Sequence, residues 1–165
     1  PAFSTQMAET VTCPTVVVPR DWEPSDGPVV VGVEDDGSDD AAVEFAAREA
    51  ETLGKEVVLV HAWRSTAPGA SSFDADLGRT GYEAAAATRL MDVSRGVRAA
   101  YPGLPITPLL DHDKPASAVI RAAAGASLIV VGTHRMDALD RLRFSSVSRT
   151  VLERSRCPVA IVPPA

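Results

Sequence analysis

The chain has 165 residues and a net charge of −6 at pH 7, and 45% of its residues are apolar while 23% are charged. A domain of this length buries about 70% of the surface of its extended chain, so it needs neither a metal nor a disulfide to fold. The acidic balance without a basic stripe argues against nucleic-acid binding, and no apolar run is long enough to span a membrane. Cys13 and Cys157 give neither a disulfide framework nor a zinc site, which favours a cytoplasmic location.

Strand-like and helix-like segments alternate through the body of the chain. Short β-branched runs without polar alternation predict strands that are covered on both faces, and the amphipathic stretches between them predict helices. Pro108, inside one of these runs, is typical of an edge strand. The predicted strands are 28–34, 56–63, 105–111, 127–132 and 157–163, and the predicted helices are 38–54, 82–101, 113–126 and 146–155.

This alternation predicts the α/β class, with three layers around a doubly wound parallel sheet and right-handed crossovers. Ligands of such sheets bind beyond the carboxyl ends of the strands, at the point where strand order reverses. The candidate site loops are therefore 34–38, 64–80 and 132–145. The segment 64–80 contains Pro, Gly and Ser and is predicted to be a long irregular loop.

The acidic segment EDDGSDD, residues 34–40, precedes the first predicted helix. We expect these carboxylates to cap the helix and to complement its dipole, with Gly54 as the cap at the other end. The segment also loosely resembles the D-x-D-G-[ST] loop of the haloacid dehalogenase-like phosphatases, whose first aspartate is a nucleophile beside magnesium. Glu34 stands at that position here, and no later lysine and acidic pair stand in suitable places, which favours the capping interpretation.

An octapeptide near the start of the chain is similar to one at the end. TCPTVVVP (12–19) and RCPVAIVP (156–163) both place Cys-Pro before a β-branched run that another proline ends. We predict that residues 1–19 are a remnant or strand of a preceding repeat, that 20–27 is a linker anchored by Trp22, and that 28–163 is the domain. A chance match of two apolar runs is the alternative. Because the chain opens with proline, we expect a processed product or a piece of something longer.

Residues 28–163 resemble the universal stress protein family. The resemblance rests on VVVGVE, VLVHAW, KPASAVIRAAAGASLIVVGTH and SSVSRTVLERSRCPVAIV. It implies a five-stranded parallel sheet of order 3-2-1-4-5, the adenine nucleotide alpha hydrolase-like arrangement, with an extra N-terminal strand at the sheet edge. Tandem copies of the domain are common in that family, which agrees with the duplicated Cys-Pro strand.

ATP-binding members of the family show G-x2-G-x9-G-[ST] after the fourth strand. On this resemblance Gly132 is the first glycine, Arg135 and Ser145 replace the other two, and Ser146 supplies the hydroxyl. Glu34 stands where the family has an aspartate near the adenosine. A left-handed Arg135 is strained by about 1–2 kcal/mol, and its side chain takes space that a phosphate needs.

As an alternative to binding by the backbone, side chains could bind the anion, because the same loop is rich in cationic side chains of the kind that bind phosphate. The other interpretation is that these groups are solvated or pair with Asp137 and Asp140. His61, by contrast, is expected to be a packed, hydrogen-bonded histidine and not a ligand or base. The cations of the loop are His134, Arg135, Arg141 and Arg143.

The resemblance implies a non-enzymatic regulatory or assembly module of the bacterial stress response, and the replaced glycines predict a degenerate nucleotide cleft with no cofactor, or with weakly bound ATP or AMP. One alternative is an ATP- or AMP-binding protein with a modified phosphate loop, and another is a magnesium-dependent phosphatase. We expect residues 14–18 to pair with the edge strand 158–162, either within the chain or between two copies in a dimer. No nucleic-acid or membrane partner is expected.

Overall fold

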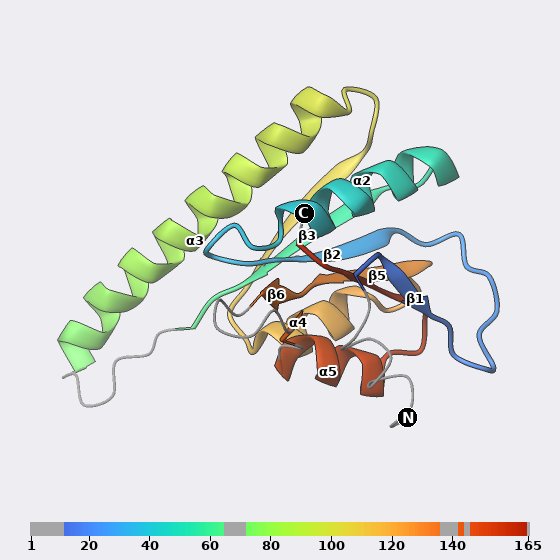
Figure 1. Cartoon of the computed structure of the whole chain (residues 1–165). Coiled ribbons are helices and arrows are strands. Elements are labelled where there is room, and N and C mark those ends of the chain that lie inside the picture. The colour runs from blue at the N-terminus through green and yellow to red at the C-terminus, as the bar shows by residue number, and fades with distance from the viewer. Residues whose placement is uncertain (1–11, 65–71, 136–141, 144–145, 165) are drawn as a thin grey trace.

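The computed structural model describes residues 12–64, 72–135, 142–143 and 146–164, and all of their side chains except those of 72–79, 134–135 and 142–143. A six-stranded sheet of order β1-β8-β5-β2-β3-β4 lies between two layers of helices (Figure 1). All neighbouring strands are parallel except β1 and β8, which are antiparallel. The strands of this sheet are β1 (Thr15–Val17), β2 (Val29–Val33), β3 (Val57–Ala62), β4 (Ile106–Asp111), β5 (Leu128–Gly132) and β8 (Val159–Val162).

The predicted topology is confirmed. Without β1, the sheet has the order 3-2-1-4-5, and β1 adds the extra N-terminal strand at one edge. Its pairing with β8 is the one expected for residues 14–18, with Val16 opposite Ala160 in the same chain. Pro108 lies on β4, which forms the opposite edge.

The parallel strands are apolar without alternation because both faces of the sheet are covered. On β2, Val29 and Val31 pack into a cluster with α2 (Asp40–Leu53) and α3 (Ser72–Ala100). Val30, between them, packs into a second cluster with α4 (Pro115–Ala122) and α5 (Ser146–Arg154). All three valines are fully buried, and each such burial contributes roughly 1.5–3 kcal/mol to stability.

The ends of the helices follow from local chemistry. α2 ends where Gly54 adopts the left-handed conformation, with φ of 64°, as its position in the sequence predicts. α4 begins with Pro115 in its first turn, as expected, but it ends at Ala122 and not at residue 126. A turn at 123–125, closed by Gly125 with φ of 78°, accounts for the earlier end.

The prediction of an irregular loop over 64–80 is wrong for its second part, because α3 begins at Ser72. Residues 65–71 lie outside the described part of the chain. The proline that predicted a loop stands before the helix, and a glycine such as Gly78 costs only about 1 kcal/mol in a helix interior. Residues 80–85 are exposed on every side, and Figure 1 shows this end of α3 extending beyond the sheet.

The linker 20–27 is fastened to the domain. Ser25 Oγ donates a hydrogen bond to the carbonyl of Gly125 at 2.6 Å, and Lys55 Nζ donates to the carbonyl of Ser25 at 2.5 Å. Trp22 packs against the cluster beneath α4 and α5, which confirms its predicted anchoring role. At Gly27 the backbones approach so closely that a Cβ atom there would lie 1.9 Å from the Gly125 oxygen.

This close approach predicts the effect of Gly27→Ala. The added methyl group forces the linker away from the turn at Gly125, so we expect a loss of about 1–3 kcal/mol in the free energy of unfolding. Gly96→Ala is the matched control, because nothing lies within 4 Å of its added methyl group on α3, and it should stabilise the protein by about 0.5–1 kcal/mol. Urea denaturation measures both changes; an unchanged midpoint for Gly27→Ala would contradict the close contact.

Candidate functional site

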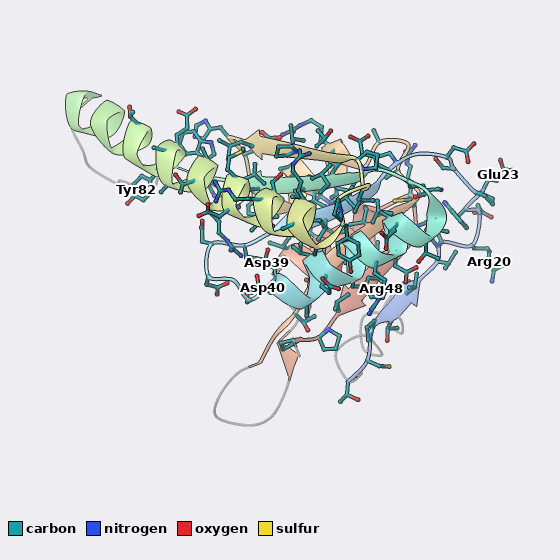
Figure 2. The ribbon with its side chains drawn as sticks, turned by 90° about the horizontal axis from the view of Figure 1, so that it is seen from above. Arg20, Glu23, Asp39, Asp40, Arg48 and Tyr82 are labelled. Carbon is teal, nitrogen blue, oxygen red and sulfur yellow. The ribbon has the colours of Figure 1, made fainter. Side chains whose placement is uncertain are left out.

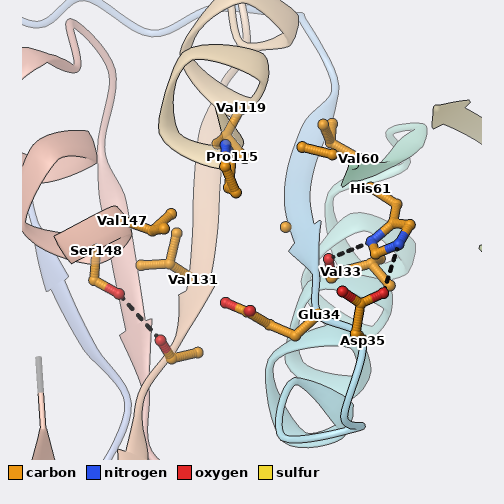
Figure 3. A pocket seen from close by; sticks show the side chains of 13 residues that line it. Val33, Glu34, Asp35, Val60, His61, Pro115, Val119, Val131, Val147 and Ser148 are labelled. Carbon is orange, nitrogen blue, oxygen red and sulfur yellow. Dashed lines mark hydrogen bonds and ion pairs between the residues drawn. The ribbon is translucent and has the colours of Figure 1, made fainter. Parts of the chain in front are cut away.

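A cleft opens where the carboxyl ends of β2 and β5 diverge, which is the point at which strand order reverses. The first residues of α4 and α5 and the end of β3 close its other sides (Figure 3). The described walls enclose about 80 Å³. The cleft therefore lies where the fold class predicts a ligand site, although typical small-molecule pockets are larger, at about 300–1,000 Å³.

Among the described residues, two of the five predicted site residues line this cleft. Glu34 follows β2, is half-buried, and points across the cleft in Figure 3. Gly132 ends β5, and its carbonyl accepts a hydrogen bond from Ser148 Oγ at 3.1 Å. A Cβ atom at Gly132 would meet ordinary contacts of 3.6–3.7 Å with the start of α2. The backbone here therefore does not itself require glycine.

The other three predicted residues lie between the end of β5 and the first residue of α5, Ser146. Arg135 lies in a short strand, β6 (His134–Arg135), which pairs antiparallel with β7 (Leu142–Arg143). Because strand backbone is extended, the predicted left-handed strain at Arg135 does not arise. The place of its guanidinium lies outside the described side chains, as does the whole of Ser145. Ser146 is the exposed first residue of α5.

His61 also lines the cleft, which the sequence analysis did not predict. It is 1% exposed, and its Nδ1 lies 2.8 Å from the carbonyl oxygen of Val33, so the expectation of a packed, hydrogen-bonded ring is confirmed. A carbonyl only accepts, so Nδ1 carries a proton. Nε2 lies 3.1 Å from Asp35 Oδ1, an exposed carboxylate, but the two atoms form no hydrogen bond.

Arg89 fixes the loop that carries Glu34. From α3, its Nε donates to the carbonyl of Glu34 at 3.0 Å, and a terminal nitrogen donates to Asp39 Oδ1 at 2.9 Å. The sequence analysis did not predict these contacts of Arg89. The available signal was the position of Arg89 within the buried stripe of α3, between Ala86 and Val93.

The expected capping of α2 by its acidic segment is only partly correct. Asp39 occupies the N-cap position but makes no capping hydrogen bond, because its carboxylate is directed to Arg89. Asp36 instead accepts from the N–H of Ser38 at 3.0 Å and from its hydroxyl at 2.6 Å. Asp40 in the first turn does complement the helix dipole.

Asp39 is fully buried, and its Oδ2 has no hydrogen-bond partner. Burial raises the pKa of this carboxyl above the ordinary value of 3.8, and the nearby backbone and the Arg89 guanidinium oppose that shift without cancelling it. Figure 2 shows Asp39 and Asp40 together at the start of α2. No group of three histidine, cysteine or acidic side chains within the described residues is arranged to hold a metal ion.

A parallel sheet of order 3-2-1-4-5, with helices on both faces and a cleft at its switch point, defines the class: an α/β protein of the adenine nucleotide alpha hydrolase-like fold. Within that class the chain belongs to the universal stress protein family, whose profile matches residues 27–163. Over the described part of the chain, none of the helices has the length and hydrophobicity to cross a bilayer.

Comparison with individual proteins gives the same family. A universal stress protein of Mycobacterium tuberculosis H37Rv is 30% identical over 168 residues, which cover 97% of this chain and 55% of that protein. This chain thus spans about half the length of the curated relatives it matches. A functionally unknown protein of Pseudomonas aeruginosa PAO1 has a similar fold, with a TM-score of 0.70 at 16% identity, over 99% of this chain and 57% of its own.

A universal stress protein solved in complex with cAMP also shares the fold. Its TM-score is 0.62 at 24% sequence identity, over 84% of this chain and 98% of its own.

The raised pKa of Asp39 predicts a pH dependence. The folded protein holds this proton more tightly than the unfolded chain, so the contribution of Asp39 to stability is largest below pH 3.8 and is lost as pH rises through the folded pKa. Asp39→Asn has no such proton. Urea unfolding is measured from pH 3.5 upward in steps of about half a pH unit. The free energy of unfolding of the native chain minus that of Asp39→Asn should fall as pH rises. A constant or rising difference would refute the shift.

Proposed function

We propose that this chain is a non-enzymatic regulatory or assembly domain of the cytoplasmic stress response, one of two similar domains in tandem, with a weakened nucleotide cleft. The observation that carries the tandem arrangement is the register between β1 and β8. Val16 pairs with Ala160, Thr15 with Ile161 and Val17 with Val159.

The register between β1 and β8 is symmetric with respect to the two octapeptides. In the alignment of the two octapeptides, Val16 is the counterpart of Ala160, so the central pair joins equivalent positions. The flanking pairs are exchanged in the same way: Thr15 corresponds to Val159 but pairs with Ile161. A pseudo-twofold axis therefore passes through the central pair. Two copies of one domain, joined through their last strands, would produce this relation.

The lengths of the relatives support the same proposal. The match with a Mycobacterium tuberculosis relative covers 97% of this chain but only 55% of the relative. The match with the Pseudomonas aeruginosa structure covers 99% of this chain and 57% of that one. A strand from a preceding domain, followed by one complete domain, is what such a share of a two-domain protein would contain. β1 would then be the last strand of the first domain.

Removing β1 tests this assembly. In a chain of residues 20–165 the edge of β8 is unpaired, and a second copy can supply its own β8 in the same register, with Ala160 opposite Ala160. We expect this chain to form a dimer, whereas residues 12–165, the matched control, keep β1 and behave as the full chain does. Light scattering after gel filtration gives the mass. An unchanged mass and melting temperature for residues 20–165 would count against the proposal.

The weakened cleft rests on two observations. Arg135 and Ser145 stand where ATP-binding members of the family have glycine. The described walls enclose only about 80 Å³. The N-terminus of α5, which begins at Ser146, nevertheless lies beside the cleft, and helix N-termini attract anions. Binding of ATP or AMP through a modified loop is the competing function, favoured by the cAMP complex of a relative and by Glu34 in the cleft.

Restoring the glycines separates the two functions. Arg135→Gly with Ser145→Gly recreates the family pattern, so we expect ATP affinity to rise at least about tenfold, because backbone N–H groups gain access to the phosphates. Arg141→Gly, which removes the same charge from the same loop, should not produce this gain. Isothermal titration with ATP and AMP, with and without magnesium, measures the affinities. Micromolar, magnesium-dependent binding by the native chain would overturn the proposal, as would phosphate release.

A further inference from the structure

A second cavity lies at the opposite end of the sheet from the cleft. It encloses about 520 Å³, which is within the size range of small-molecule sites, about 300–1,000 Å³. Residues 21–25 of the linker, here called the strap, form one side. The other sides are the C-terminal ends of α4 and α5 and the beginning of β5. We call this cavity the strap pocket.

The floor of the strap pocket is apolar. Its side chains belong to the buried cluster beneath α4 and α5 or pack against it, and Trp22 of the strap packs against the same cluster. Burial raises the pKa of the Cys157 thiol, so this group stays neutral near pH 7. Ser155 Oγ is already bonded to the backbone of Cys157. The floor consists of Ile120, Ala123, Ala126, Ile129 and Cys157.

The rim of the strap pocket is charged but balanced. Asp21 and Glu23 stand on the strap, and Arg154 and Arg156 stand on the side of α5. Among the described residues, none of these four side chains forms an ion pair. Two carboxylates and two guanidinium groups cancel, so the rim gives little net attraction to an ion of either sign.

The pocket exists before any ligand arrives, because the strap is held at both ends. At one end Trp22 packs against the buried cluster beneath α4 and α5, and at the other Ser25 Oγ donates to the carbonyl of Gly125 at 2.6 Å. A ligand would therefore not have to order the strap, which lowers the entropic cost of binding.

We propose that the strap pocket binds an uncharged, ring-containing apolar small molecule. Trp22 offers an aromatic surface on one side, and the side chains around Ile129 offer an aliphatic surface beneath. This site is independent of the nucleotide cleft: Ile129 lies near the beginning of β5, and Gly132, at the other end of that strand, lines the cleft.

N-phenyl-1-naphthylamine, a neutral ring compound whose emission rises in apolar surroundings, is the probe. We use the full chain carrying Trp63→Phe, in which Trp22 is the only tryptophan. The probe should saturate at one molecule per chain and quench the emission of Trp22. Ala124→Phe places a ring in the pocket from an exposed position, so we expect the probe affinity to fall at least about tenfold.

Ala99→Phe is the matched control, since Ala99 is also exposed but lies on α3, and the affinity of this variant for the probe should not change. The anionic analogue 8-anilinonaphthalene-1-sulfonate should bind no more tightly than the neutral probe. Circular dichroism and the melting temperature establish that Ala124→Phe is folded. The proposal fails if the native chain does not saturate with the probe, if the two phenylalanine variants behave alike, or if the sulfonate binds more tightly.

Discussion

The covering of both faces of the sheet is the constraint from which the rest of the structure follows. Each central strand alternates between two apolar clusters, so no polar side chain is accommodated along β2 or β5 until the strands end. Polar groups are therefore displaced toward the strand ends, and at the switch point they come from the loop after β2 and from the end of β3. The cleft with Glu34, Asp35 and His61 is a result of this arrangement.

A buried ionic contact then fixes the shape of that cleft. Asp39 is held in the interior by Arg89, which also bonds to the carbonyl of Glu34, so α3 determines where the loop after β2 lies. The contact leaves Asp39 Oδ2 unpartnered, which is consistent with the raised pKa of this carboxyl. Changes at Arg89 can thus reach the cleft, although none of the described side chains of α3 lines it.

The sequence contained most of the fold because strand periodicity and helix ends are local signals. β-Branched runs such as those around Val30 and Ile129 predicted the parallel strands of the sheet. The repeated octapeptide predicted the edge strand β1. The beginning of α3 was missed because its polar, glycine-containing first turns have no apolar stripe to signal a helix. Arg89 and Asp39 were missed for a different reason: their pairing joins residues distant in sequence, and no periodicity records it.

The sequence predicted the place of some site residues correctly but not the backbone conformation of Arg135. Glu34 and Gly132 could be placed because they end strands, and the strand ends converge in any doubly wound sheet. The strain expected at Arg135 assumed the backbone of a glycine loop, whereas a short ribbon of β6 and β7 makes this residue extended. A hairpin of two residues on each side carries too short a pattern for the alternation of a strand to be recognised.

The prolines that border β1 and its partner β8 have a consequence for the fidelity of folding. Pro14 and Pro19 bracket β1, and Pro158 and Pro163 bracket β8. A slip of one residue would turn the side chains of β1 to the wrong face. A slip of two would begin to bring a residue without an amide hydrogen into the ladder. Short strands with such stops at both ends can align in few ways, which protects this junction from mispairing.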